Sequence, residues 1–312
     1  MCARVGDRVG RLELMSPWGI GTSDKRESIM SLVVDTHVHV WEISEKYPVG
    51  PTARKFTSKP DEPATAEQLI ADMDANGVDW TVIVQTSWST WDNGYIADSA
   101  SKYPGRLIGH GMLDPQDEAG NAAAARYWIQ DRGLVGFRFH PMYYKDAKVL
   151  TTEGNRAMWE VLAEHAAVIQ LHTSAPFADQ IDAIAKRHPQ MKLLIDHMGY
   201  PTAVGDISTW QPILDLAQRP NVYVKISDVK GAAEEEFPFR DRHVYVKALV
   251  DTFGAERCLW GTGYPGHHRV KHGWLSLADE LRLVREGFDF LSDTQRERIL
   301  GGTAAEVWGL DG

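Results

Sequence analysis

The stretch Val33-Val34-Asp35-Thr36-His37-Val38-His39 decides how this chain is interpreted. A short run rich in β-branched residues leads into a His-x-His pair. On a β-strand, residues i and i+2 point to the same side, so the side chains of His37 and His39 would project together. Two imidazoles in this arrangement suit a metal such as zinc, iron or manganese. The alternative is that both histidines simply belong to a buried strand.

Three later segments repeat the pattern of an apolar run that ends in histidine. They span residues 135–140, 168–172 and 193–197 and end at His140, His172 and His197. Arg138 precedes His140 by two residues and so shares its side of the predicted strand. Core packing alone does not explain four such segments, whereas ligands at the C-terminal ends of several strands are typical of a (β/α)8 active site.

Composition narrows the class of protein. The chain has 312 residues, 43% of them hydrophobic and 24% charged, which is enough for one large α/β domain. Its formal net charge of −10 argues against nucleic acid or an anionic membrane surface as a partner. No apolar run approaches the roughly 20 residues of a membrane-spanning helix. Cys2 and Cys258 are too few for a disulfide framework, so we expect a cytoplasmic protein.

Residues 1–29 differ from the rest of the sequence. Arg4, Arg8 and Arg11 lie among glycines, and no apolar segment of signal-peptide length follows them. Met30 stands just before the first predicted strand. We expect residues 1–29 to be a disordered or loosely packed extension and residues 30–312 to form one barrel domain.

Eight apolar segments alternate with segments of helical periodicity, which predicts a single (β/α)8 TIM barrel. The predicted strands are 32–36, 80–85, 107–112, 134–139, 168–171, 192–196, 222–226 and 257–261. The predicted helices are one that starts at a Thr65–Gln68 capping box and ends at Gly77, and 155–165, 177–187, 213–218, 244–253, 277–286 and 293–308. The long proline-containing connection at about 41–64 would lie over the mouth of the barrel.

Several of these motifs together resemble the amidohydrolase-related (amidohydrolase-2) branch of the amidohydrolase superfamily. The matching segments are 35–39, 172, 195–199 and 260–265, and the resemblance spans roughly residues 32–309. It implies a (β/α)8 barrel with a mononuclear metal, commonly zinc, at its mouth. Members include lactonases and other hydrolases, non-oxidative decarboxylases and some metal-dependent oxygenases.

The resemblance also implies roles for individual residues. The metal ligands fall on His37, His39 and His172, with zinc the first choice and iron or manganese the alternatives. His197 falls on the histidine that supports the metal-bound water or the substrate.

Two residues of the 135–140 segment are candidates for binding substrate. The planar fork of Arg138 suits a substrate carboxylate, although a structural ion pair, perhaps with Asp196, is the alternative. His140 is either a further substrate contact or a core histidine bonded to backbone. Lys225 and Ser227, in the seventh predicted strand, have no assigned role at this point.

One position departs from the family pattern. The motif of the last strand usually carries an aspartate that binds the metal and shuttles a proton, and here that position is Gly263. Three interpretations follow. A neighbour such as His267, His268 or Asp196 acts as the base instead; the chemistry does not need the shuttle; or the chain is a non-catalytic partner of an active homologue.

The leading functional expectation is a metal-dependent hydrolase of a small carboxylate-bearing lactone, ester or amide. The alternatives are a non-oxidative decarboxylase, a metal-dependent oxygenase and an auxiliary subunit. We expect a homo-oligomer or, for the auxiliary case, a hetero-oligomer with a homologous subunit.

Overall fold

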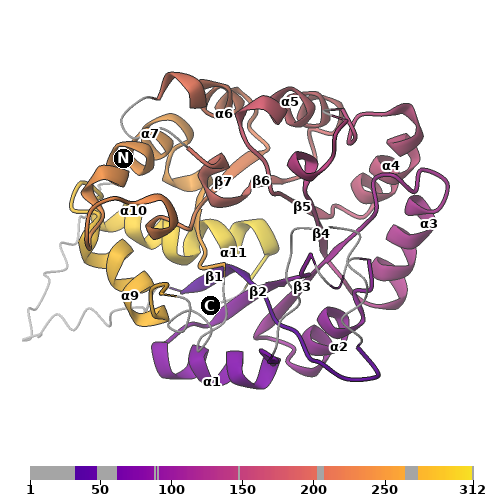
Figure 1. Ribbon diagram of the computed structural model, residues 1–312, viewed down its shortest axis with the longest axis horizontal. Coiled ribbons are helices and arrows are strands. Elements are labelled where there is room, and N and C mark those ends of the chain that lie inside the picture. The colour runs from indigo at the N-terminus through magenta and orange to yellow at the C-terminus, as the bar shows by residue number, and fades with distance from the viewer. Residues whose placement is uncertain are drawn as a thin grey trace, which may run out of the picture. The chain divides into compact units, whose positions relative to one another are not determined.

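The computed structural model describes residues 32–47, 62–87, 89, 91–146, 148–201, 207–263 and 273–310. Eight parallel strands follow one another in chain order in a single sheet. They are β1 (Val34–Val38), β2 (Trp80–Val84), β3 (Leu107–Met112), β4 (Gly136–Phe139), β5 (Val168–Leu171), β6 (Leu193–Ile195), β7 (Val222–Ile226) and β8 (Cys258–Trp260). Helices lie outside these strands (Figure 1), and the predicted (β/α)8 barrel is confirmed.

The described helices are α1 (Ala66–Asn76), α2 (Gly94–Lys102), α3 (Asn121–Arg126), α4 (Arg156–Glu164), α5 (Ala178–Arg187), α6 (Gln211–Asp215), α7 (Arg240–Phe253), α9 (Leu277–Arg282), α10 (Asp293–Glu297) and α11 (Thr303–Trp308). Helix α1 begins at the predicted capping box, in which Thr65 and Gln68 bond each other's backbone N–H, and it ends at Gly77, whose φ is +66°. Helices α2 and α3 were not predicted, because small or polar residues fill most of their buried positions.

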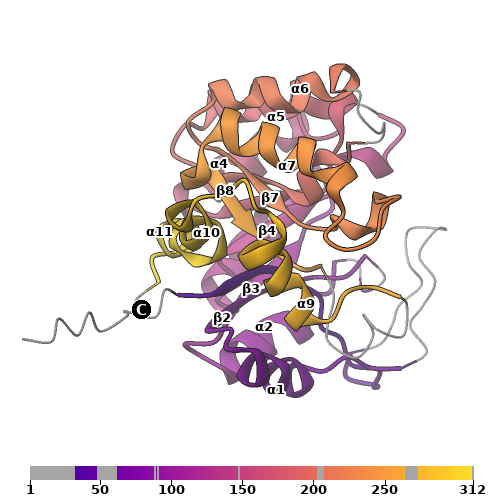
Figure 2. The same ribbon diagram turned by 90° about the vertical axis from the view of Figure 1, so that its left-hand side faces the viewer.

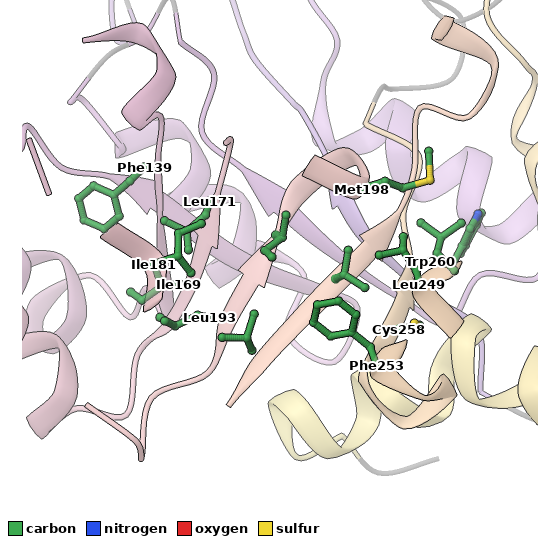
Figure 3. Packing of buried hydrophobic residues seen from close by; sticks show 14 of the residues in the cluster. Phe139, Ile169, Leu171, Ile181, Leu193, Met198, Leu249, Phe253, Cys258 and Trp260 are labelled. Atoms are coloured by element: carbon green, nitrogen blue, oxygen red, sulfur yellow. The ribbon is translucent and has the colours of Figure 1, made fainter. Parts of the chain in front are cut away.

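Helices and strands pack through continuous apolar surfaces. Figure 3 shows Ile181 of α5 beside Ile169 and Leu171 of β5, while Phe253 of α7 lies near Cys258 of β8. Strands buried on both faces need apolar residues at nearly every position, which explains why they appear in the sequence as unbroken apolar runs. Helices α5, α6 and α7 lie on the same side of the barrel in Figures 1 and 2.

The first and last strands meet through specific hydrogen bonds. The hydroxyl of Thr36 donates to the carbonyl of Trp260 at 2.6 Å. The carboxylate of Asp35 accepts from the backbone N–H and the hydroxyl of Thr262, at 3.0 and 2.6 Å. The backbone N–H of Gly263 donates to the carbonyl of His37. These bonds close the barrel at the ends of the strands from which the predicted site residues come.

The connection after β1 is closed at its base. Trp41 and Ala64 form an antiparallel bridge, and the indole N–H of Trp41 donates to the carbonyl of Glu62 at 2.8 Å. Residues 48–61 and 1–31 lie outside the described residues, so the loop over the mouth and the N-terminal extension stay predictions. No helix in the described part of the chain is long and apolar enough to span a membrane.

Candidate active site

Four imidazoles and one guanidinium meet at the C-terminal end of the barrel. His37 lies in β1 and His39 follows it, Arg138 comes from β4, His172 follows β5 and His197 follows β6. The ring centroid of His37 lies 5.1 Å from that of His39 and 4.8 Å from that of His197. The ring centroids of His172 and His197 are 5.8 Å apart. The fold therefore brings together the four histidines selected from separate segments of the sequence, which we call the imidazole cluster.

The Arg138 guanidinium lies within the imidazole cluster. Its Nη1 is 3.5 Å from Nε2 of His39, and its Nη2 is 3.0 Å from Nδ1 of His172 and 3.3 Å from Nε2 of His197. Arginine can only donate, so these three ring nitrogens present lone pairs to it. Nε2 of His37 is buried and has no hydrogen-bond partner among the described residues.

The opposite ring nitrogens are held by the scaffold. Nδ1 of His39 lies 2.8 Å from the carbonyl of Val84, which can only accept, so the proton of this ring is at Nδ1. Nδ1 of His37 lies 3.3 Å from Oδ1 of Asp196. The contact with Val84 leaves Nε2 of His39 as a lone pair. Nδ1 of His37 also lies 3.3 Å from Nζ of Lys225, and these outer contacts fix the orientation of both rings.

Burial keeps the imidazole cluster neutral. Removal from water is the main cause that lowers the pKa of His37 and His172 well below the ordinary value of a histidine, and it lowers the pKa of His39 and His197 to about 3. The positive charge of Arg138 acts in the same direction on all four rings. Neutral rings at neutral pH are the form that donates a lone pair to a cation.

Asp196 binds two buried cations beside the imidazole cluster. Its carboxylate lies 2.8 Å from Nε of Arg138 and 3.1 Å from Nζ of Lys225. Burial opposes the negative charge, but Lys225, His37 and Arg138 hold the pKa of Asp196 well below its usual value. Burial also lowers the pKa of Lys225 to about 8. The structural ion pair considered for Arg138 is therefore present, and Lys225 is its second cation.

Ser227, which the sequence left without a role, orients a site residue. Its hydroxyl oxygen lies 2.9 Å from Nδ1 of His197. Because Arg138 donates to Nε2 of the same ring, the ring proton is at Nδ1 and is donated to Ser227. The sequence signals for these contacts were a lysine within the otherwise apolar β7 and a serine directly after it.

The site contains donors of the kind that a divalent metal needs. Among the described residues, His37, Asp196 and His197 have candidate ligand atoms within 4.8 Å of one another. This group shares only His37 with the predicted ligands His37, His39 and His172. Neutral imidazole nitrogens, a carboxylate and the unpartnered buried Nε2 of His37 together fit a transition metal.

A cavity of about 250 Å³ opens above the imidazole cluster. Arg138, His140 and His172 line it, so the two predicted substrate contacts both face the cavity. The ring of His140 stacks on Tyr143, with centroids 5.1 Å apart and an interplanar angle of 8°. The ring of His172 stacks on Tyr200 at 5.1 Å and 26°.

Several residues that line the cavity were not predicted from the sequence. Tyr200, Asp228 and Glu280 come from segments that follow β6 and β7 or lie in α9. Glu280 is buried. Nothing in its local pattern distinguishes it from an ordinary helical glutamate, whereas the motif around His197 was a signal for Tyr200.

Gly263 also lines the cavity, beside His197. A Cβ at this position would lie 3.5 Å from Cε1 of His197, with no other heavy atom of the described residues within 4 Å. The φ of Gly263 is +86°, a conformation that side-chain-bearing residues rarely adopt. Space is therefore available for a side chain, but the backbone favours glycine. His267 and His268, the candidate replacement bases, lie outside the described residues.

Comparison with known proteins gives a consistent assignment. An L-fucono-1,5-lactonase from Burkholderia ambifaria is 27% identical over 299 residues, which are 90% of this chain and 97% of that protein. A 4-sulfomuconolactone hydrolase from Hydrogenophaga intermedia is 26% identical over 285 residues, 88% of each chain. The structure of an amidohydrolase from Burkholderia multivorans with bound zinc has a TM-score of 0.69 and 21% identity, and covers 90% of this chain and 100% of its own.

The last of these comparisons supports the fold, and the family assignment rests on the sequence. A family model described as amidohydrolase matches residues 34–310, from β1 to the end of the described barrel. The chain therefore belongs to the amidohydrolase family and is an enzyme.

Proposed function

We propose that the enzyme hydrolyses a small lactone that carries a carboxylate group. The observation that carries this proposal is the guanidinium of Arg138, a residue that is only 3% exposed and that lines the cavity together with neutral imidazoles and aromatic rings. Lys230, Asp228 and Glu280 line the same cavity. The names of the two relatives, a lactonase and a lactone hydrolase, support hydrolysis of this class of bond.

Arg138 is the proposed binding group for the carboxylate. Its Nε is held by Asp196, which leaves the two Nη atoms directed toward the imidazole cluster and the cavity. A planar guanidinium with two such donors matches a carboxylate or a developing oxyanion. His140, stacked on Tyr143, offers a flat surface next to it for the ring of the substrate.

We also propose zinc as the metal, with His37, His39 and His172 as its ligands. Asp196 is already paired with two cations, so its proposed role is to orient His37 through Nδ1. When bound, the ion would polarise the lactone carbonyl and activate water. Zinc in the amidohydrolase from Burkholderia multivorans supports this choice.

His197 is the proposed partner of the attacking water. Its Nε2 lone pair points to the Arg138 guanidinium, and Ser227 holds the other ring nitrogen. When the substrate carboxylate engages Arg138, Nε2 can accept a hydrogen bond from water and direct that water toward the carbonyl carbon. The ring thus positions the nucleophile while Arg138 positions the substrate.

The test is an assay of the purified chain against matched lactones with and without a carboxylate, together with esters, amides and aromatic carboxylic acids. We expect ring opening of the carboxylate-bearing lactones, followed as acid release. Release of CO2 from the acids without lactone hydrolysis would instead identify a decarboxylase. Activity that appears only after addition of a homologous subunit would identify an auxiliary chain.

A further inference from the structure

We propose that the guanidinium of Arg138 and a divalent metal ion compete for the ring nitrogens of the imidazole cluster. This inference rests on the proposed metal site, and the competition itself does not depend on the proposed substrate. It makes Arg138 a determinant of metal affinity in addition to its proposed role in substrate binding.

The lone pairs of three ring nitrogens point toward the guanidinium of Arg138. Arg138 donates to Nε2 of His39, Nδ1 of His172 and Nε2 of His197. A neutral imidazole has one lone pair in the plane of its ring, and that pair can bind a proton donor or a metal ion but not both. Two of the three proposed zinc ligands, His39 and His172, are therefore already engaged.

The three contacts between Arg138 and the ring nitrogens differ in length. The contact with His172 has an ordinary length of 3.0 Å, whereas those with His39 and His197, at 3.5 and 3.3 Å, lie beyond the usual range for N–H donors. Nε2 of His37 is buried without any partner among the described residues. The guanidinium thus satisfies the lone pairs of the imidazole cluster only in part, and a smaller ion of higher charge would satisfy the same nitrogens better.

A divalent ion bound to the imidazole cluster would be repelled by two buried cations, Arg138 and Lys225. A divalent ion at these nitrogens would lie within a few ångströms of the guanidinium and of Lys225, whose Nζ is 3.3 Å from Nδ1 of His37. The carboxylate of Asp196 is shared between both of those cations. Like charges in a buried site repel strongly because little water screens them. Metal binding therefore requires the Nη atoms of Arg138 to leave the ring nitrogens.

The consequence is a linkage between metal and substrate. Arg138 remains anchored to Asp196 through Nε, at 2.8 Å, while its Nη atoms are released. The cavity lies beside these atoms, so metal binding would present them to a carboxylate. Zinc and a carboxylate ligand should then each increase the affinity of the enzyme for the other.

The experiment titrates zinc into metal-stripped protein by calorimetry, with a chelator of known affinity as competitor. Arg138→Met removes the charge and keeps most of the volume; Arg138→Lys keeps a charge without the planar fork. Arg132→Met, which removes an arginine paired with Asp98 at the surface, is the matched control. We expect at least about a tenfold gain in zinc affinity for Arg138→Met, a smaller change for Arg138→Lys and none for the control.

A second pair of measurements keeps the test decisive. Adding His37→Ala to Arg138→Met should remove the gain in zinc affinity, because the proposed zinc site uses the imidazole of His37. Equal or weaker zinc binding by a folded Arg138→Met overturns the proposal. If this variant does not fold, the proposal is tested with crystals of the wild type soaked in zinc. Zinc at the imidazole cluster with the guanidinium withdrawn supports competition, while zinc beside an unmoved guanidinium, or no zinc at saturation, overturns it. A failed lactone assay changes none of these outcomes.

Discussion

At the scale of the residue, Arg138 is the side chain on which most of the site depends. One end of its guanidinium is paired with buried Asp196, and the other end contacts three histidines. The ion pair and the binding role, which are alternatives when the sequence is considered alone, are compatible in the folded chain because different nitrogens serve them.

Replacing Arg138 by Met should weaken binding of a carboxylate-bearing substrate by about 2–5 kcal/mol, since a buried charge partner is lost. The free energy of unfolding should also fall, because Asp196 loses one of its two buried cations and keeps Lys225. Inhibition by a carboxylate product analogue and urea unfolding measure the two effects. A neutral lactone without a carboxylate is the control substrate, and an equal loss with that lactone would contradict the assigned contact.

Two substitutions at Gly263 separate the energetic cost of its backbone conformation from the effect of an added carboxylate on zinc affinity. At a φ of +86°, Gly263→Ala should lower the free energy of unfolding by about 1 kcal/mol or more. Gly263→Asp should carry the same cost but bind zinc more tightly than Gly263→Ala, because it adds an anionic ligand beside His197. Urea unfolding and zinc titration of both variants check this, and equal zinc affinities would refute it.

At the scale of the element, the closure between β1 and the segment after β8 determines where the imidazole cluster stands. Asp35 accepts from two donors of Thr262 and also from the backbone N–H of His37 at 3.1 Å. The same carboxylate therefore joins the barrel and fixes the backbone of a predicted metal ligand. No local sequence pattern signals this contact, because the two segments are separated by most of the chain.

Thr262→Val should lower the free energy of unfolding by about 1–3 kcal/mol, because it removes a donor from a buried carboxylate while keeping the volume of the side chain. Thr262→Ser retains the hydroxyl and is the matched control, for which a smaller loss is expected. Chemical unfolding of the three proteins measures the difference. Similar losses for valine and serine would mean that packing, and not the bond to Asp35, stabilises this closure.

At the scale of the whole molecule, the barrel also buries a histidine that does not belong to the imidazole cluster. His110 lies away from the imidazole cluster and is buried against α11, where the indole N–H of Trp308 donates to its Nε2 at 3.1 Å. Burial lowers its pKa from 6.5 to about 3. The folded state therefore binds fewer protons than the unfolded state, and stability is lost as the pH falls below about 6.5 toward 3.

For His110 alone, this loss amounts to about 2 kcal/mol at about pH 5. His110→Gln should remove that part of the pH dependence while retaining an acceptor for Trp308. Urea unfolding of the variant and the wild type at neutral pH and near pH 5 measures the difference. Identical slopes for wild type and His110→Gln would contradict the assignment.

The sequence by itself determined the architecture and the members of the imidazole cluster. Parallel strands buried on both faces must be apolar throughout, so eight such segments separated by helices predict the barrel and place His37, His39, His172 and His197 at its C-terminal end. It did not predict α2 and α3, because small or polar residues fill most of their buried positions and the neighbours against which they pack determine such short helices.

Only the tertiary structure decided how these residues interact. That Asp196 binds both Arg138 and Lys225, and that the guanidinium enters the imidazole cluster, depends on the relative positions of β4, β6 and β7. The tertiary structure likewise revealed the positive φ of Gly263 and the bond from Thr262 to Asp35. Local patterns specify which face of a strand a residue occupies, whereas distances between strands arise only when the barrel closes and buried charges must find partners.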